Sequence, residues 1–344
     1  ARSDHRAGLD TPSLAFVHCA YSARAEGAAP IESLRASEQD ARMGRDNALV
    51  TRAIGSGELG HVRRILDTSE YTYTRFAPDE LPGLLARLPA MGLFRQPGGR
   101  LARLTGGALI AFLLCNWLNP PSGWIGGFGV TWSEGAAFED HLDALLPALL
   151  ARLRDAGMAT AYYSGGDVAS DWLRAPLERR DFHLTTLLRS YDKEDMAIPT
   201  PGNRDVRVRP FAPSDVAGTL AVESLCFAPL WRHSAENFLE IHATYPYFVV
   251  AEDDAGIVGY QFNATDATTG YLVRIAVHPR AEGRGVGARL LAEAVRYFQR
   301  AHVLKIVLNT EEANTRAQAL YERFGFHFVP PRGFVLARDL APAR

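Results

Sequence analysis

The feature that most constrains the fold of this 344-residue chain is a pattern that occurs twice. The segment Arg75-Phe-Ala-Pro-Asp-Glu-Leu81 returns as Pro210-Phe-Ala-Pro-Ser-Asp-Val216. Further along, Leu177-Glu-Arg-Arg-Asp-Phe-His183 returns as Tyr321-Glu-Arg-Phe-Gly-Phe-His327, in the same order and at nearly the same separation. Because self-similarity at a fixed period is the signature of repeated structural units, we expect two copies of one domain.

The hydropathy pattern predicts similar elements in both copies. In the second copy we expect strands at 206–209, Tyr247–Glu252, Ile257–Ala264, Tyr271–Val277 and Lys305–Asn309, and helices from about Gly287 and near Asn314–Phe324. In the first copy we expect strands at Leu109–Asn116, Trp124–Thr131 and Thr160–Tyr163, and helices at Phe138–Ala156 and Val168–Arg179. The predicted class is therefore α/β (α+β): two tandem domains, each a mixed, mostly antiparallel sheet flanked by helices.

The domain boundaries follow from changes in this pattern. Residues 1–66 show neither a strand nor a helix period, and we expect a poorly specified N-terminal leader there. The first copy is assigned to 67–196 and the second to 205–341. The intervening 197–204 contains two prolines and a glycine, which is typical of a short, stiff linker.

Composition restricts the function. The net charge of −2 argues against a broad electrostatic surface for nucleic acid or for a membrane. The longest apolar run, Ala108–Leu118, is shorter than the ~20 residues that span a bilayer. The three cysteines lie far apart and show no metal-ligand spacing. We therefore expect a reduced, cytoplasmic protein without a bound metal.

The segment that carries the chemistry is Ile275-Ala-Val-His-Pro-Arg-Ala-Glu-Gly-Arg-Gly-Val-Gly-Ala-Arg289. It predicts a strand that ends at Val277, a loop with alternating glycines, and an amphipathic helix. The glycines permit positive φ and a close backbone approach to a ligand. The first N–H groups of the helix have no intrahelical partner and favour negative charge. A pyrophosphate is the anion that fits this arrangement.

A Rossmann dinucleotide site is the competing interpretation of these glycines. It would place them after the first strand of a βαβ unit, with an acidic residue about 20 positions further on. Here the loop follows the fourth expected strand of its copy, after antiparallel hairpins. The order of the elements favours the first interpretation.

The segment IAVHPRAEGRGVGARLL, followed by NTRAQALYERFGF, resembles the paired acetyl-CoA motifs of the GNAT superfamily of N-acetyltransferases. Together with ESLCFAPLW and YFVVAEDDAGIVGY, they resemble in particular the ribosomal-protein alanine N-acetyltransferases. The resemblance covers the second copy. It implies an acetyltransferase that uses acetyl-CoA as acyl donor and acts on a small-molecule amine or a peptide N-terminus.

The resemblance also implies roles for individual residues. Backbone groups of Ile275, Ala276 and Val277 would hold the acetyl group and the pantetheine. Asn314 would bond to the pantetheine, and Tyr321 would lie beside the sulfur and protonate the leaving thiolate. The pyrophosphate would be wrapped by Gly283, Arg284, Gly285, Val286, Gly287 and Ala288.

Two positions depart from the family pattern. Glu282 replaces the usual Gln or Arg, so we expect weaker attraction for phosphate. In the alanine N-acetyltransferases, a glutamate five residues before the motif Asn acts as the base, and here that position is Asn309. Since an amide cannot accept a proton at neutral pH, the base must lie elsewhere, and Glu311 and Glu312 are the candidates.

Other polar residues near the motif have simpler expected roles. His278 is expected to form local hydrogen bonds. Arg274, in the middle of a strand, either meets an acidic partner in the core or faces the substrate. Ser234 is expected to cap a helix without a full capping box, because Asn237 stands where Glu or Gln would complete it.

The first copy has a different loop, Ser133-Glu-Gly-Ala-Ala-Phe-Glu-Asp140, at the equivalent position. One glycine remains, and three carboxylates stand where they would repel a pyrophosphate. Leu177 replaces the tyrosine. We expect the first copy to be degenerate and to bind no CoA, as in tandem GNAT proteins such as mycothiol synthase, which the whole chain resembles.

These observations predict an N-acyltransferase in which a primary amine attacks acetyl-CoA directly in a ternary complex. A non-catalytic acyl-CoA sensor is the alternative from another functional class, and a longer acyl donor is also open.

Overall fold

The computed structural model describes residues 48–96 and 107–340. They separate into two compact units. The N-terminal unit ends at Tyr163, and Asp339 and Leu340 also belong to it, while the C-terminal unit runs from Ser164 to Arg338. Of the predicted leader, 1–47 lies outside the described residues.

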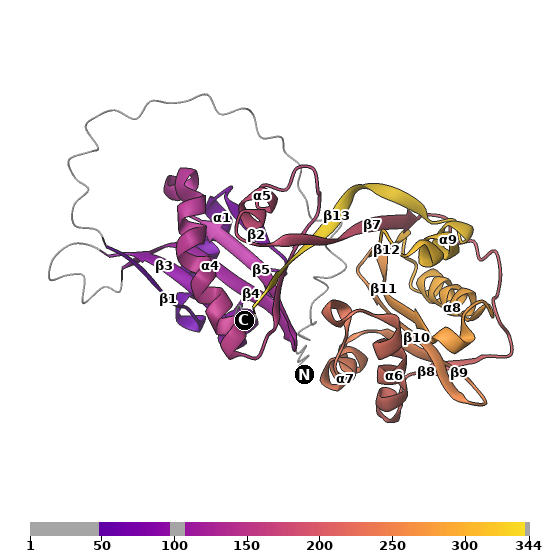
Figure 1. Ribbon diagram of the computed structural model, residues 1–344. Coiled ribbons are helices and arrows are strands. Elements are labelled where there is room, and N and C mark those ends of the chain that lie inside the picture. Colours follow the sequence, from indigo (N-terminus) through magenta and orange to yellow (C-terminus); the bar gives the residue numbers. More distant parts are fainter. Residues whose placement is uncertain (1–47, 97–106, 341–344) are drawn as a thin grey trace, which may run out of the picture. The chain divides into compact units, whose positions relative to one another are not determined.

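The N-terminal unit contains a sheet in the order β1-β3-β4-β5-β6, with β2 paired to β5 (Figure 1). Its strands are β1 (Leu49–Ala53), β2 (Thr72–Thr74), β3 (Ala90–Arg95), β4 (Ala108–Asn119), β5 (Ser122–Val130) and β6 (Thr160–Gly165). Its helices are α1 (Leu59–Thr68), α2 (Leu81–Arg87) and α4 (Phe138–Asp155), with short 3₁₀ turns at Ser56–Glu58 and Trp132–Ala137.

The prediction of a leader over 1–66 was wrong at its C-terminal end, because 49–66 contain β1 and most of α1. β1 pairs antiparallel with β3, from Leu49 opposite Arg95 to Ala53 opposite Met91. This strand is short and its residues are partly or fully exposed, so it carries little of the alternation by which strands are recognised. Helix α1 buries only Val62 and Ile65.

The C-terminal unit contains a sheet in the order β13-β7-β12-β11-β10-β9-β8. Its strands are β7 (His183–Lys193), β8 (Arg207–Pro210), β9 (Tyr247–Asp253), β10 (Gly256–Thr265), β11 (Thr269–Val277), β12 (Lys305–Glu311) and β13 (His327–Asp339). Its helices are α5 (Arg174–Glu178), α6 (Val216–Cys226), α7 (Ala235–Thr244), α8 (Val286–Arg300) and α9 (Thr315–Arg323), with 3₁₀ turns at Pro213–Asp215, Pro229–Trp231 and Pro279–Ala281. The mixed, mostly antiparallel sheet with flanking helices confirms the predicted class.

The same succession of elements occurs twice, as the repeated sequence predicts. An antiparallel hairpin, a long helix, a strand parallel to the second hairpin strand and a short helix follow one another in both copies. They are β4-β5-α4-β6-α5 in the first copy and β10-β11-α8-β12-α9 in the second. The shared Phe-Ala-Pro motif also has one local structure, since the side chains of Glu80 and Asp215 accept hydrogen bonds from the N–H groups of Ala77 and Ala212.

Strand β7 pairs outside the copy that its sequence position suggests. It follows α5 as β13 follows α9, yet it lies between β12 and β13 in the sheet of the C-terminal unit. It is antiparallel to both, with Tyr191 opposite Leu308 and also opposite Phe328. The contact boundary therefore falls after Tyr163, upstream of the linker expected at 197–204.

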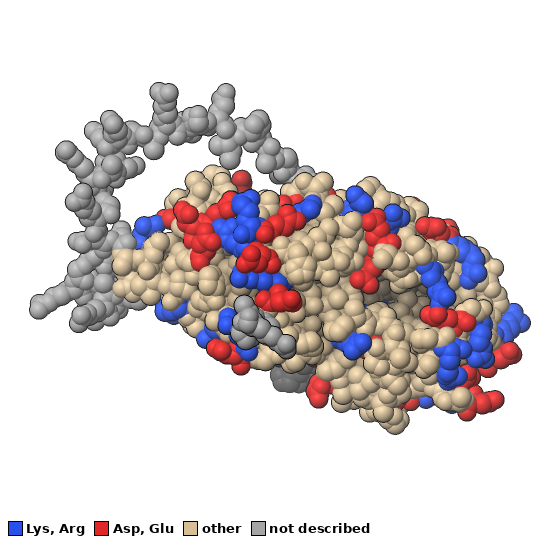
Figure 2. Space-filling view, viewed as in Figure 1, with Lys and Arg blue, Asp and Glu red and all other residues tan. Residues whose placement is uncertain are grey.

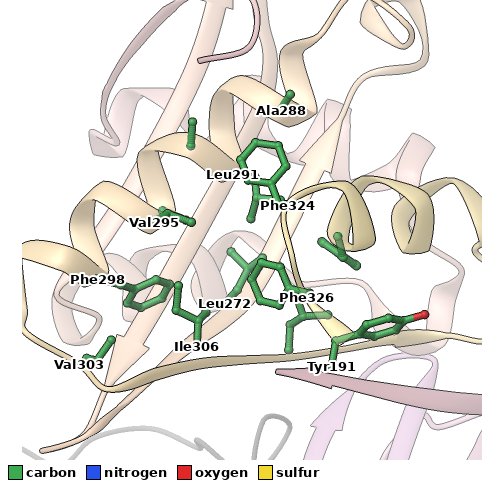
Figure 3. Packing of buried hydrophobic residues seen from close by; sticks show 14 residues of the cluster. Tyr191, Leu272, Ala288, Leu291, Val295, Phe298, Val303, Ile306, Phe324 and Phe326 are labelled. Atoms are coloured by element: carbon green, nitrogen blue, oxygen red, sulfur yellow. The ribbon is translucent and has the colours of Figure 1, made fainter. Parts of the chain in front are cut away.

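The helices cover both faces of the C-terminal sheet. α6 and α7 pack on one face through Val222, Phe238 and Ile241, against Tyr260 and Phe262 of β10. α8 packs on the other face, because its apolar stripe points toward the strands. The stripe predicted from the sequence is buried: Leu290, Leu291, Ala294, Val295 and Phe298. Figure 3 shows part of it with Leu272, Ile306, Phe324 and Phe326.

β11 and β12 run parallel, but their ladder is short. It joins Thr269, Gly270 and Tyr271 to Lys305, Ile306 and Val307 and then ends, although β11 continues to Val277 and β12 to Glu311. Beyond Tyr271, β11 is paired only with β10 among the described strands. The two strands thus separate toward their C-terminal ends, and this separation positions the site.

Candidate functional site

The glycine loop has the backbone conformation that its sequence predicts. Gly283 and Gly285 have φ of 73° and 78°, in the left-handed region that side chains disfavour. Gly285 precedes the first turn of α8, which has neither a side-chain cap nor an acidic residue. Within the described residues, no backbone group accepts from the N–H groups of Gly285, Val286, Gly287 or Ala288. The positive end of the α8 dipole is therefore available to an anion.

The three motif elements meet at Gly287. A Cβ atom placed there would lie 3.2 Å from Leu320 Cδ2 of α9 and 3.6 Å from Val277 Cγ2 of β11. From the sequence, only the family resemblance predicted that these three segments form one site. In the structure, the end of β11, the start of α8 and the middle of α9 are in contact.

At the end of β11, Ala276 is buried, while Ile275 and Val277 are partly exposed. Val277 O accepts a hydrogen bond from Cys226 Sγ at 3.2 Å, and His278 N donates to Val258 O. Burial raises the pKa of the Cys226 thiol to about 11, so the thiol stays protonated at neutral pH. The backbone of this strand end is thus fixed from two sides.

Helix α9 presents the other two predicted residues. Asn314 caps it, because Asn314 Oδ1 accepts from Ala317 N at 3.1 Å. Tyr321 is buried, with ring centroids 6.1 Å from Tyr191 and 5.9 Å from Phe326. Burial raises the pKa of Tyr321 above its ordinary value, so its hydroxyl carries a proton at neutral pH.

The charges around the loop are largely paired. Arg280 binds Asp253 through both terminal nitrogens, at 2.8 and 3.0 Å, while Arg284 lies 3.6 Å from Asp253 and is about half exposed. Glu282, expected to weaken phosphate binding, forms an ion pair with Arg316 of α9. Its negative charge is therefore partly compensated. Basic and acidic side chains alternate over the C-terminal unit on the face shown in Figure 2.

The two candidate bases differ in their surroundings. Glu312 Oε1 accepts from Arg189 Nε at 3.0 Å and lies 3.4 Å from Arg332. The hydrogen bond from Arg189 holds the pKa of Glu312 below its usual value, which makes it a weak proton acceptor. Glu311, at the end of β12, forms no ion pair with another described side chain.

A buried polar cluster beneath the end of β11 was only partly foreseen. Arg274 meets an acidic partner, which confirms the first alternative for it: its Nη2 donates to Glu223 Oε1 at 2.5 Å. Glu223, on α6, also accepts from the Tyr260 hydroxyl and from His233 N. The Arg274 guanidinium lies 3.6 Å from the ring centroid of Phe227. Glu223 had no sequence signal beyond its place in the family motif.

Two local expectations can be compared directly. His278 Nδ1 accepts from Arg280 N at 3.0 Å, which confirms its local role. The capping box at α7 is complete, contrary to prediction: Ser234 Oγ accepts from Asn237 N, and Asn237 Oδ1 accepts from Ser234 N. The shorter amide of asparagine reaches the same N–H group that Glu or Gln would reach.

The equivalent loop of the N-terminal unit is filled by protein. A Cβ atom at Gly135 would lie 2.0 Å from the Tyr71 ring, so that ring occupies the space beside the loop. Glu134 forms an ion pair with Arg95 and lies 3.1 Å from His141 Nε2.

Within 48–96 and 107–340, no helix has the length and apolar character that crossing a bilayer requires. No group of three or more His, Cys, Asp or Glu side chains is arranged to hold a metal ion in the same part of the chain.

Comparison with known proteins agrees with this geometry. Residues 219–326 match the Acetyltransferase (GNAT) family. An uncharacterised N-acetyltransferase of Methanocaldococcus jannaschii is 31% identical over 121 residues, which cover 35% of this chain and 76% of that protein. A mycothiol acetyltransferase of Salinispora tropica is 27% identical over 241 residues, 65% of this chain and 76% of the relative.

A solved structure has a similar fold across both units. It is a tandem GNAT protein from the clavulanic acid biosynthesis pathway, with a TM-score of 0.58 and 14% identity. The match covers 86% of this chain and 100% of that one. By the family match and the N-acetyltransferase relative, this chain belongs to the GNAT family of acetyltransferases, and it is an acyltransferase.

Proposed function

We propose that the C-terminal unit binds acetyl-CoA and transfers its acetyl group to a primary amine of a small molecule. The observation that carries the proposal is the uncapped start of α8 behind two left-handed glycines, at the place where β11 and β12 separate. The pyrophosphate would lie on the N–H groups of 285–288, and the pantetheine arm would run between the two strands toward Val277. GNAT acetyltransferases as a family use acetyl-CoA.

The proposed reaction is a direct transfer. The neutral amine nitrogen attacks the thioester carbonyl and forms the C–N bond, which gives a tetrahedral oxyanion. The nitrogen then loses one proton, the C–S bond breaks and the thiolate of CoA leaves. The N–H of Val277 would stabilise the oxyanion that forms. Tyr321 would return a proton to the departing thiolate, since its hydroxyl is protonated at neutral pH.

The proton from the amine needs an acceptor. Glu312 is held by two arginines and Glu223 by three donors, which leaves both poorly suited to accept it. We assign this role to Glu311, acting through water at the end of β12. With Glu311 in this role, the site has a base although the amide of Asn309 cannot accept a proton.

The acceptor class is inferred from the extent of the similarity. The mycothiol acetyltransferase of Salinispora tropica matches over 65% of this chain, which is more than the C-terminal unit alone contains. That relation favours a small-molecule amine over a peptide N-terminus. The N-terminal unit would bind no CoA, because Tyr71 fills its loop and Glu134 places a carboxylate there.

The test is release of free thiol from acetyl-CoA in the presence of amines, including the acceptor of the mycothiol acetyltransferases and a set of N-terminal peptides. We expect turnover with a small-molecule amine. CoA binding without turnover on any amine would support a non-catalytic sensor of acyl-CoA. This alternative is favoured by two features: Glu312 is bound by arginines, and Asn309 cannot act as a base. Absence of CoA binding would refute both.

A further inference from the structure

The segment between the two repeats lies directly against the glycine loop. Asn203 N donates to Gly285 O at 3.1 Å, and Asn203 Nδ2 donates to Arg284 O at 2.9 Å. The sequence had assigned Asn203 to a linker that only connects two domains. In the structure, both of its donors are used on consecutive carbonyls of the loop.

The contact is close enough to require a glycine beside Asn203. Gly202 has φ of 70°, and a Cβ atom there would lie 2.1 Å from Arg289 N and 2.7 Å from Ala288 C. These are backbone atoms of the first turn of α8, which cannot move aside as a flexible side chain can. The linker therefore packs backbone against backbone on the start of the helix.

Peptide geometry connects these hydrogen bonds to the anion site. In a planar trans peptide, the C=O and the N–H of one unit point in opposite directions. The carbonyl of Arg284 shares its peptide plane with the N–H of Gly285, and the carbonyl of Gly285 shares its plane with the N–H of Val286. Because Asn203 donates to both carbonyls, both N–H groups point away from the linker. The Gly285 carbonyl also accepts from Arg289 N at 3.0 Å, whereas Asn203 Nδ2 is the donor to the Arg284 carbonyl among the described residues, so the Arg284–Gly285 peptide depends most on Asn203.

We infer that Asn203 is a positioning residue for CoA: it holds the N–H groups of Gly285 and Val286 in the orientation that binds the pyrophosphate. The inference rests on the proposed function, since it assumes that CoA binds at this loop. Without the Asn203 side chain, Gly283 and Gly285 would leave the Arg284–Gly285 peptide free to rotate, and binding would have to order it. The linker is by this inference a part of the donor site.

The pyrophosphate then lies on the opposite side of the loop from the linker. The linker side holds a pocket of about 500 Å³, lined by residues that include Thr200, Arg284 and Arg323. Two guanidinium groups there offer phosphate an alternative place. Substitutions on the two sides of the loop can show which side binds the phosphates.

The test compares Asn203→Ser with Thr200→Val in the full chain. Asn203→Ser keeps a hydroxyl acceptor for Asp205 N, which now donates to Asn203 Oδ1 at 2.8 Å, removes the Nδ2 donor to Arg284 O and adds no charge. Thr200→Val removes a hydrogen bond inside the linker, from Gly202 N at 3.2 Å, and leaves the loop carbonyls bound. The Kd of CoA is measured by calorimetry, and kcat/KM with acetyl-CoA and with S-acetylpantetheine, which has no pyrophosphate.

We expect Asn203→Ser to raise the Kd of CoA about tenfold and to lower kcat/KM for acetyl-CoA by the same factor, as for loss of a preorganised charge-assisted contact between the loop N–H and the pyrophosphate. The kcat/KM for S-acetylpantetheine should stay within about twofold, and Thr200→Val should match the wild type. Equal losses of kcat/KM with acetyl-CoA and with S-acetylpantetheine would overturn the inference. An unchanged Kd of CoA would overturn it as well.

Arg323→Gln tests the side of the loop. It should change the Kd of CoA by less than about twofold, because an exposed charge on the far side contributes little. A loss as large as that of Asn203→Ser would place the phosphates on the linker side and overturn the inference. If the wild type binds no CoA, the proposed function itself fails, which is a different result.

Discussion

The packing role of the Tyr321 ring and the proposed proton transfer by its hydroxyl can be tested independently. Its ring lies beside that of Tyr191, whose hydroxyl donates to Glu322 Oε1 at 3.3 Å, so two tyrosines share one environment. Removing the Tyr321 hydroxyl should lower kcat by about 10²-fold, the lower end of the range for a general acid, with little change in the Kd of acetyl-CoA. Stopped-flow thiol release and calorimetry on Tyr321→Phe measure the two quantities.

Tyr191→Phe is the matched control, because it removes a neighbouring hydroxyl from the same cluster. Its kcat should equal that of the wild type. If Tyr321→Phe also keeps the wild-type rate, the hydroxyl has no part in protonating the thiolate.

The two adjacent glutamates make a second comparison at the scale of single residues. Glu311→Gln should lower kcat by about 10²-fold, because it removes the proposed proton acceptor. Glu312→Gln should leave kcat close to that of the wild type, since the hydrogen bond from Arg189 already keeps the pKa of Glu312 low. A larger loss of kcat for Glu312→Gln would reverse the assignment.

At the scale of the element, the start of α6 depends on one carboxylate. Asp215 is buried, accepts from Arg209 at 2.6 and 2.8 Å and from Ala212 N at 2.8 Å, and its pKa is lowered chiefly by Arg209. Asp215→Asn should cost about 1–3 kcal/mol of unfolding free energy at pH 7, as for loss of charge-assisted hydrogen bonds. Urea unfolding measures the loss.

The pH dependence of that loss has a definite sign. Because the folded pKa is depressed, the stabilisation is complete above the unfolded pKa of about 3.9 and is lost as the pH falls through the folded pKa. The difference between wild type and Asp215→Asn should therefore shrink below about pH 4. Asp254→Asn, in an exposed turn, is the control and should be about as stable as the wild type at pH 7. A difference for Asp215→Asn that does not shrink as the pH falls below about 4 would mean that packing, not charge, is responsible.

The elements were predictable where their signal is local. The buried stripe of α8 and the glycine loop depend on residues close together in the sequence, so periodicity and backbone preference identify them. Short exposed β1 carries no such signal. The capping box at Asn237 was misjudged because a preference among residue types was applied as a requirement. Glu223, Arg274 and Tyr260 meet only in three dimensions, and no spacing in the sequence encodes that contact.

At the scale of the whole molecule, the pairing of β7 decides which fragments can fold. A chain of 164–340 contains β7 and should unfold cooperatively. A chain of 203–340 lacks it, which leaves the facing edges of β12 and β13 without their common neighbour. We expect the shorter chain to be markedly less stable or to aggregate, as measured by thermal melting and light scattering.

The longer fragment also tests which unit binds the donor. CoA at ~100 times its Kd should stabilise 164–340 by about 2.7 kcal/mol, and it should leave 48–163 unchanged. A comparable shift in the melting temperature of 48–163 would show that the N-terminal unit is not degenerate. Equal stability of 164–340 and 203–340 would contradict the structural importance of β7.

The repeat itself was visible in the sequence, but the exchange of β7 was not. Repetition shows that two segments form similar elements; it does not show in which sheet a strand lies, because either sheet satisfies the same alternation. The sequence boundary at 197–204 is a boundary of the repeat, and the contact boundary lies before β7.

The position of β7 also bears on proteolysis. A single cut between Glu194 and Ile198 would sever the chain just after β7, yet the strand would remain bound on both sides, to β12 and to β13. The two pieces would stay associated as a nicked protein until a denaturant separated them. Two separately synthesised halves, one ending after β7 and one beginning after it, could for the same reason reassemble by strand insertion.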